Sequence, residues 1–319
     1  MRVLLTGSSG WLGRTLAPML AARGHRVTGL DVAPGDHTQI VGSIAERSVV
    51  DRAFADHGIE AVIHAAALHK PDIARYSRQA FVDVNVTGTL NLLEAVVAAR
   101  HRRFVFTSTT SLMISQSIRD ERSDRAVWLD EQSGPIEPRN IYGVTKFAAE
   151  QACRLVAEEH GLSVIALRTG RFFSEDDDTH RALSGENMKA NELLHRRLTV
   201  EDAAAAHIAA LEHDGPVGYH LYLAAAPTPF SLEDVVELGR DAASVIARYF
   251  PHAPALYAAR GWMLPPSIGR VYDSSALCRD LDFRFATDFA GVIRAMERGK
   301  PLPFAHDADY VSPAAGMFS

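Results

Sequence analysis

The sequence has few of the features that mark secreted, membrane-bound or nucleic-acid-binding proteins. Its 319 residues include two cysteines, Cys153 and Cys278, which excludes a disulfide framework and a Cys-x-x-Cys pair. No run of about 18 apolar residues occurs, so we expect no membrane span, and the glycine at position 7 comes too soon for a signal peptide. Asp and Glu (39) outnumber Lys and Arg (33), so the net charge of −6 gives no reason to expect nucleic acid. We therefore expect a cytoplasmic protein with reduced thiols, no membrane association and no nucleic-acid partner.

The chain contains 14 histidines, which are potential metal ligands. His64 and His69 stand five residues apart around the end of a predicted strand, with no other ligands clustered near them, so we expect no metal site. The chain is 47% hydrophobic and 23% charged, which is ordinary globular usage and supports a core without disulfides or metals.

Short apolar runs alternate with longer helical patterns through the first half of the chain. The predicted strands are Arg2–Thr6, Arg26–Asp31, Gln39–Val41, Ala61–Ala65, Arg103–Thr107 and Ser163–Arg168. The predicted helices are Trp11–Arg23, Ala45–Asp56, one within Ser77–Ala99, and Tyr142–His160. Alternating strands and helices pair in parallel through right-handed crossovers. We therefore predict an α/β fold with a doubly wound parallel sheet of the Rossmann type, which binds ligands beyond the carboxyl ends of its strands.

The alternating pattern weakens after Arg168. We predict an acidic loop at Ser174–His180, a helix at Val200–His213, a strand at Tyr219–Ala224 and a helix at Ser231–Gly239. Prolines 251, 254, 265 and 266 interrupt the region that follows. We divide the chain into a nucleotide-binding Rossmann domain at 1–170 and a mainly substrate-binding, smaller C-terminal lobe at 171–319, with some of its segments returning to the first domain.

A glycine-rich turn joins the first predicted strand to the first helix. Gly7, Gly10 and Gly13 are spaced three apart. Gly7 allows a sharp turn, Gly10 removes a side chain where a pyrophosphate approaches, and Gly13 allows the helix to pack closely on the sheet. The helix N-terminus then favours the anionic pyrophosphate. No Gly-Lys-Ser/Thr follows, which excludes a Walker phosphate loop.

Asp31 ends the second predicted strand, 18 residues beyond Gly13. A carboxylate at that place accepts hydrogen bonds from the adenosine ribose and repels the additional phosphate of NADP. The alternative is an ordinary solvent-facing acid at a strand end.

Hydroxyl groups and a Tyr-x-x-x-Lys motif follow the fifth strand. Tyr142 and Lys146 share one helix face, and an ammonium near a phenol favours the phenolate and lowers its pKa. Tyr142 is therefore a candidate general acid/base. The run from Thr107 to Ser111 places hydroxyls at a strand end, where one of them can polarise a substrate carbonyl.

Together these motifs resemble the extended short-chain dehydrogenase/reductases, and more narrowly the NAD-dependent epimerase/dehydratase family. The resemblance also rests on His64-Ala65-Ala66-Ala67, on Asn85 within Val84–Thr89, and on Leu198–Ala203, which is similar to a later V-x-D-x-A segment. It is strong over Met1–Arg168 and patchy beyond.

The resemblance implies a role for each matched residue. Tyr142 carries the proton, Lys146 holds the ribose and tunes Tyr142, and Thr109 orients the substrate, with Thr110 and Ser111 as alternatives. NAD is the implied cofactor, bound by Gly7, Ser9, Gly10, Trp11, Leu12, Gly13, Asp31, Ser43, Ile44, Ala65, Ala66, Ala67, Asn85, Thr107, Tyr142 and Lys146. Homodimers that form through the Ser77–Ala99 and Tyr142–His160 helices are common in this family, so we expect a homodimer.

Three positions depart from the family pattern. Ser43 stands where an aspartate often contacts adenine, Arg171 where nucleotide-sugar members carry an asparagine, and His195 where many carry a phosphate-binding arginine. Arg196 and Arg197 are adjacent to His195. These departures argue against a sugar nucleotide as substrate without excluding it.

We therefore expect NAD-dependent hydride transfer at a secondary alcohol or ketone of a small polyhydroxylated substrate, with an epimerase, dehydrogenase or ketoreductase outcome. The alternatives are a nucleotide-sugar 4-epimerase specifically, and a non-catalytic NAD-binding regulator. We predict substrate contacts from Thr109, Thr110, His69 and Arg171, and an anionic substrate group bound by Arg171. The alternative for Arg171 is a salt bridge to the acidic stretch Glu175–Asp178.

Overall fold

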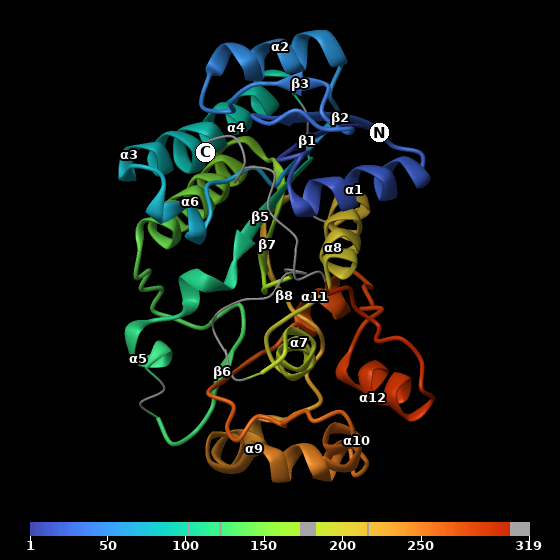
Figure 1. Ribbon diagram of the computed structural model, residues 1–319. Helices are drawn as coiled ribbons and strands as arrows, with labels where there is room; N and C mark the ends of the chain where they lie inside the picture. The colour runs from blue at the N-terminus through green and yellow to red at the C-terminus, as the bar shows by residue number, and fades with distance from the viewer. Residues whose placement is uncertain (101–102, 121–122, 173–182, 216, 307–319) are drawn as a thin grey trace.

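The computed structural model describes residues 1–100, 103–120, 123–172, 183–215 and 217–306 (Figure 1). Its strands are β1 (Arg2–Thr6), β2 (Arg26–Asp31), β3 (Ile40–Val41), β4 (Ala61–His64), β5 (Arg103–Thr109), β6 (Val127–Leu129), β7 (Ser163–Thr169), β8 (Gly218–Ala224) and β9 (Arg270–Tyr272). Its α-helices are α1 (Trp11–Ala22), α2 (Arg47–His57), α3 (Arg78–Phe81), α4 (Gly88–Ala98), α5 (Gln116–Arg119), α6 (Ile141–His160), α7 (Gly185–Leu193), α8 (Val200–Glu212), α9 (Val235–Tyr249), α10 (Ala253–Ala259), α11 (Ser275–Asp280) and α12 (Phe289–Glu297).

Seven strands form one parallel sheet in the order β3-β2-β1-β4-β5-β7-β8. The chain moves outward from β1 in one direction through β2 and β3, and then in the other direction through β4, β5, β7 and β8. This reversal of strand order beside β1 creates the crevice in which doubly wound folds bind ligands. The prediction of a doubly wound Rossmann-type sheet is therefore confirmed.

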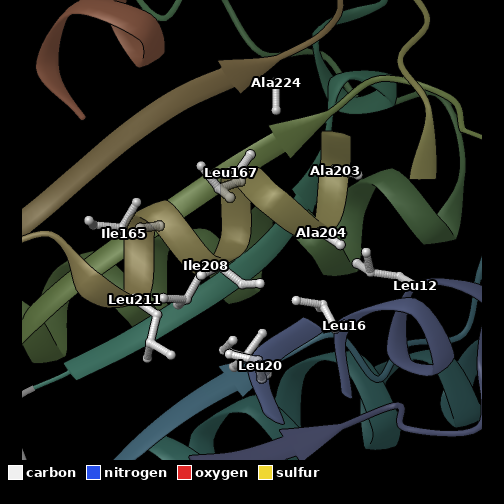
Figure 2. Packing of buried hydrophobic residues seen from close by; sticks show 14 of the residues in the cluster. Leu12, Leu16, Leu20, Ile165, Leu167, Ala203, Ala204, Ile208, Leu211 and Ala224 are labelled. Carbon is white, nitrogen blue, oxygen red and sulfur yellow. The ribbon is translucent and has the colours of Figure 1, made fainter. Parts of the chain in front are cut away.

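Helices cover both faces of the sheet, as buried parallel strands require. On one face, Leu12, Leu16 and Leu20 of α1 meet Ile208 and Leu211 of α8 over the apolar side chains of β1, β5 and β7 (Figure 2). On the other face, α2, α4 and α6 pack against the alternate residues of the same strands. The large apolar area removed from water on both faces fixes the strand ends where the site is built.

A second hydrophobic cluster organises the smaller lobe. It is formed by α7, α9, α10 and α12 together with Val271 of β9. β6 pairs in parallel with β9, so a segment that precedes residue 170 joins the C-terminal region. α8 and β8 follow residue 171 and pack with the large sheet. The division at residue 170 stays a prediction.

The region from Arg78 to Ala98 contains an irregular helix. Six residues, Val82–Thr87, form a π-helical segment (η2) between α3 and α4. The segment Arg78–Ala98 is long and apolar enough to cross a membrane, with a mean hydropathy of 1.3 over its most apolar stretch. Half of that stretch is buried within the protein. Core helices of soluble proteins can have the same length and composition, so this is weak evidence for a membrane.

Most predicted boundaries lie within two residues of the observed ones. The sequence analysis did not predict β6, α5, α7, α10, β9, α11 and α12. The predicted helix Ser231–Gly239 is observed as a 3-10 turn (Leu232–Asp234) followed by α9, which extends to Tyr249. The predicted loop Ser174–His180 lies outside the described residues.

Candidate active site

The glycine loop has the geometry of a pyrophosphate cradle. Gly7 has a φ of +75°, which side chains rarely tolerate, and a Cβ there would lie 2.8 Å from the amide nitrogen of Ala66. A Cβ on Gly13 would lie 2.1 Å from the carbonyl oxygen of Gly7. Gly10 is the N-cap of α1, and no side chain caps this helix. The uncapped helix end, held between tight glycine contacts, fits the dinucleotide that the sequence predicts.

Asp31 is fixed beside this loop. Its Oδ2 accepts a hydrogen bond from the amide of Ser9 at 3.0 Å, and its Oδ1 accepts one from the amide of Ala33 at 2.9 Å. The Ser9 hydroxyl donates to the carbonyl of Ala33 at 2.7 Å. The backbone thus orients the carboxylate at the end of β2, and each oxygen retains accepting capacity for a ribose hydroxyl.

The other predicted cofactor residues occupy different depths around the crevice. Ala65, Ala66 and Ala67 follow β4 and are half-buried. Ser43 is half-buried and accepts from the amide of Ala45, while Ile44 is 3% exposed and packs within the core. Trp11 is half-buried and Leu12 belongs to the core between α1 and α8.

Asn85 and Thr107 form hydrogen bonds within the protein. Asn85 lies in the π-helical segment, is 1% exposed, and exchanges hydrogen bonds with the backbone of Leu68 at 2.8 and 3.0 Å. Its amide also donates to Thr145 at 3.0 Å. The Thr107 hydroxyl bonds His207 on α8 at 2.7 Å. These side chains therefore brace the loop after β4 and the underside of the sheet, and their direct contact with a cofactor stays a prediction.

Tyr142 and Thr109 are brought together at the carboxyl end of β5. Asn140 caps α6 by accepting from the amide of Gly143 at 3.0 Å, which starts the helix just before Tyr142. The side chain of Thr109 lies close enough to the Tyr142 hydroxyl to lower the pKa of the phenol. His69 lies over the same tyrosine, with the two ring centroids 5.8 Å apart. A phenol, a hydroxyl and an imidazole thus lie close together at this end of the sheet.

Thr110 points away from this group. Its hydroxyl donates to the carbonyl of Thr169 on β7 at 3.3 Å, and its side chain is buried. Ser111 donates its amide to Thr109 Oγ1 at 3.1 Å. Among the three hydroxyl residues considered, the geometry favours Thr109 as the substrate-orienting group.

The electrostatics of Tyr142 and Lys146 differ from expectation. Burial raises the pKa of Tyr142 to about 12, and the Thr109 side chain offsets part of this rise. Burial lowers the pKa of Lys146 to about 8, although the nearby Glu150 opposes this. The Lys146 ammonium lies 4.0 Å from the centre of the Phe106 ring. The expectation that Lys146 lowers the pKa of Tyr142 is therefore wrong for this structure, because desolvation dominates.

A family model for the NAD dependent epimerase/dehydratase family matches residues 3–224, more than half of the chain. The chain belongs to this family. Membership confirms the predicted enzyme class and confirms NAD as the family's cofactor. It places the chain among the extended short-chain dehydrogenase/reductases.

Curated relatives in this family include sugar-converting enzymes. An L-arabinose 1-dehydrogenase (NAD(P)(+)) of Haloferax volcanii is 32% identical over 186 residues, covering 55% of this chain and 69% of the relative. A UDP-glucose 4-epimerase of Rhizobium meliloti is 33% identical over 173 residues, covering 52% of this chain and 50% of the relative. The match thus spans about half the length of that epimerase.

Solved structures share the whole fold. A short-chain dehydrogenase/reductase superfamily protein from Agrobacterium tumefaciens with bound NAD has a TM-score of 0.66 at 21% identity, covering 94% of this chain and 98% of the other. The UDP-glucose 4-epimerase of Thermus thermophilus in complex with NAD has a TM-score of 0.63 at 23% identity, covering 92% and 97%. These likenesses extend the fold assignment beyond residue 224.

The epimerase/dehydratase fold here carries a neutral histidine at position 195. Burial, together with the charge of Arg196, lowers the pKa of His195 to about 3. Its Nδ1 bonds the carbonyl of Arg270 at 2.8 Å. The imidazole is therefore uncharged near neutral pH and cannot replace a phosphate-binding arginine.

The adjacent arginines are engaged by Glu192. Arg197 Nε donates to Glu192 Oε2 at 3.0 Å, and Arg196 donates to Glu192 Oε1. Burial opposes ionisation of Glu192, but the charges of Arg196, Arg197 and Arg171 hold its pKa well below the usual range. Arg171 is half-buried, and its carbonyl accepts from the amide of Leu198 at 3.2 Å. Its predicted alternative partners, Glu175–Asp178, lie outside the described residues.

A buried ionic network missed by the sequence analysis supports the catalytic helix. Glu150, two turns beyond Tyr142 on α6, accepts from the Ser108 hydroxyl at 2.5 Å. It also accepts from Arg168 Nε at 3.0 Å and Nη2 at 2.8 Å. All three side chains are almost fully buried. The sequence signal was available, since Glu150 continues the face of Tyr142 and Lys146 at i+8 and i+4.

Proposed function

We propose that this enzyme transfers a hydride between NAD and a secondary alcohol or ketone carbon of a small, sugar-like substrate. The observation that carries the proposal is the proximity of the Tyr142 phenol to Thr109 at the end of β5, with Lys146 one turn along α6 from Tyr142. The names of the relatives, an L-arabinose dehydrogenase and UDP-glucose 4-epimerases, support a carbohydrate substrate.

NAD supplies the hydride acceptor when bound, and the residues of the chain manage the substrate oxygen. Tyr142 gives or takes the hydroxyl proton as general acid/base. Thr109 donates a hydrogen bond that orients the substrate oxygen. Lys146 binds the ribose hydroxyls and places a positive charge beneath the reacting groups. The high pKa of Tyr142 keeps it protonated before substrate binds, which suits ketone reduction; oxidation requires that ligand binding lower it.

A nucleotide-sugar 4-epimerase is the second candidate, favoured by the names of several relatives. The uncharged His195 and the engagement of Arg196 and Arg197 with Glu192 argue against a diphosphate anchor. A non-catalytic regulator explains the site less well than an enzyme does, because Tyr142, Lys146 and Thr109 are all present in the crevice.

A substrate panel tests the proposal. NAD-loaded enzyme is mixed with sugars, sugar acids and nucleotide sugars, and both NADH formation and product stereochemistry are followed. A dehydrogenase accumulates NADH, whereas an epimerase inverts one carbon without net NADH. Absence of both products across the panel contradicts the proposal.

We also propose a cytoplasmic homodimer that associates through α4 and α6. Leu90, Val144 and Leu155 on these helices are 37%, 48% and 54% exposed, which leaves apolar surface uncovered in the single chain. Sedimentation analysis checks this proposal, and a monomer at micromolar concentration contradicts it.

A further inference from the structure

Arg270, on β9 in the smaller lobe, is a buried cation without an anionic partner. The residue is 9% exposed. Its Nε donates to the hydroxyl of Tyr272 at 3.3 Å, which satisfies one of five donors. Within the part of the chain that the structure describes, no carboxylate forms a salt bridge with this guanidinium. The terminal nitrogens Nη1 and Nη2 are not among the fully buried, unpartnered polar atoms of the described residues, so they remain accessible to a ligand.

The charges around Arg270 add to its own. Burial lowers the pKa of Arg139, and the guanidiniums of Arg119 and Arg270 lower it further, which shows that these cations lie within electrostatic reach. His195 contacts the Arg270 backbone but is uncharged near neutral pH. The local potential is therefore positive.

The nearby carboxylates are used elsewhere. Glu192 binds Arg196 and Arg197. Asp120 acts on Arg139 but is exposed, and it accepts a hydrogen bond from Gln116 at 2.6 Å. Neither of these acids is a hydrogen-bond partner of Arg270.

Arg270 lies close to the catalytic loop. Tyr272, its hydrogen-bond partner, packs in one cluster with Leu112, Met113 and Ile114, which follow directly after Thr109. Arg139 Nε donates to the carbonyl of Ile114 at 2.7 Å. The two guanidiniums thus border the same short loop that carries the proposed substrate-orienting hydroxyl.

We propose that Arg270, assisted by Arg139, binds an anionic group of the substrate, either a carboxylate or a phosphate. This inference rests on the proposed function, because it places the anion on the molecule whose hydroxyl Tyr142 deprotonates. A planar guanidinium offers paired donors that match either group. An incoming anion would pair with a guanidinium that has no carboxylate partner among the described residues.

Arg270 meets this requirement better than Arg171, which the sequence singled out. Arg171 already acts on the carboxylate of Glu192, whereas Arg270 has a tyrosine hydroxyl as its hydrogen-bond acceptor. The sequence could not show this difference, because Arg171 follows β7, Arg270 begins β9, and only the fold supplies their partners.

Calorimetric titration of NAD-loaded protein tests the proposal without requiring turnover. The probes are glucose, glucuronate and glucose 6-phosphate, which share a ring and differ in charge. We expect one anionic sugar to bind at least about tenfold more tightly than glucose, and Arg270→Met to weaken that binding by about 10- to 100-fold while glucose binding stays unchanged. The tighter of the two anionic probes identifies carboxylate or phosphate as the recognised group.

Two further measurements make the result decisive. Arg240→Met removes an exposed arginine of the same lobe that pairs with Asp124, and it should leave all three affinities unchanged. The ligand-free Arg270→Met protein should melt close to the wild-type temperature, which separates loss of anion binding from loss of folding. If Arg270→Met does not fold, Arg270→Lys, which keeps the charge but loses the planar fork, should weaken anion binding.

Equal binding of the three probes by the wild type, or an unchanged anion preference in the Arg270 variants, overturns the proposal. These outcomes differ from failure of the proposed function. Anion binding that depends on Arg270, without any turnover of NAD, would support the proposed anion site and contradict the proposed hydride-transfer reaction.

Discussion

Two buried arginines show how the cofactor half and the substrate half of the molecule differ. Arg168, on β7 of the large sheet, is 4% exposed and makes two hydrogen bonds with the carboxylate of Glu150. Arg270, on β9 of the smaller lobe, is 9% exposed, and among the described residues its hydrogen-bond partner is the hydroxyl of Tyr272. The first guanidinium is paired with a carboxylate of the folded chain, and we propose that the second pairs with an anion of the substrate.

Lys146 extends the comparison to the catalytic helix. It is buried, and it contacts the face of Phe106 while Glu150, one turn further along α6, is engaged by Ser108 and Arg168. Lys146 therefore resembles Arg270 more than Arg168. A cation that is hydrogen-bonded to a carboxylate stabilises the fold, whereas a cation in the crevice without such a bond is a candidate to bind a ligand.

The largest effect is expected at Tyr142. Tyr142→Phe should reduce turnover by about 10²- to 10⁴-fold, because a positioned proton donor is lost, while NAD affinity and melting temperature stay near wild type. Steady-state rates and calorimetry measure these quantities. Glu158→Gln, at an exposed position near the C-terminal end of the same helix, is the control. Near-normal turnover by the phenylalanine variant would reject Tyr142 as the proton carrier.

Arg168→Met sharpens the contrast with Arg270. Removing one partner of a buried ion pair leaves Glu150 charged and unpaired, so the free energy of unfolding should fall by about 3–5 kcal/mol. Arg270→Met should change it much less, because Arg270 has no carboxylate partner among the described residues. Denaturant titration of both variants measures the two changes, and an equal fall in both would remove the distinction between the two arginines.

The buried ammonium of Lys146 predicts a pH dependence of stability. Its pKa is about 8 in the folded chain against 10.5 for an ordinary lysine, so the folded state releases this proton first. Between pH 8 and 10.5 the unfolded state binds more protons, and stability contributed by this group rises with pH.

The wild-type free energy of unfolding, taken relative to Lys146→Met, should therefore increase by about 3 kcal/mol across this window, since one pKa unit corresponds to about 1.4 kcal/mol. Denaturant titrations of both proteins without cofactor measure the difference. A difference in unfolding free energy that does not change with pH would show that the ammonium is not desolvated.

Asp31 predicts cofactor selectivity in the cofactor half. NAD should bind at least about tenfold more tightly than NADP, because the fixed carboxylate accepts ribose hydrogen bonds and repels a 2′-phosphate. Asp31→Asn should reduce the difference between the NAD and NADP affinities. Calorimetric titration with both cofactors measures it, and equal affinity in the wild type would remove Asp31 from the site.

The smallest effect is expected from Arg171→Lys. Because Arg171 already interacts with Glu192, this variant should raise the Michaelis constant of an anionic substrate by about two- to threefold, less than Arg270→Met does. Steady-state kinetics on the best substrate of the panel compares the two variants. A larger increase for Arg171→Lys would return the anion anchor to Arg171.

The cofactor half was predictable because its signals are local. Gly7, Gly10 and Gly13 act within one turn, and Tyr142 and Lys146 lie on one helix face. Apolar strands that are buried on both faces appear as continuous runs. The main error there was electrostatic, since the burial that raises the pKa of Tyr142 depends on the packing of distant segments.

The substrate half was less predictable because its contacts are long-range. β6 and β9 are three residues each and pair across more than 140 positions of sequence, so neither has a recognisable period. α7 is nearly buried all around and carries Asn187, Lys189 and Glu192 among its buried residues, which hides the amphipathic pattern. The role proposed for Arg270 can be inferred only from the fold, which shows that the nearby carboxylates form hydrogen bonds with other residues.

Deuterium placed on the reacting carbon of the best substrate tests the central claim most directly. Hydride transfer should carry the label to the nicotinamide ring in a dehydrogenase, or return it to the inverted carbon in an epimerase, without exchange into water in either case. Mass spectrometry of cofactor and product follows the label. Loss of deuterium to solvent would show that the carbon is deprotonated, which contradicts hydride transfer by this enzyme.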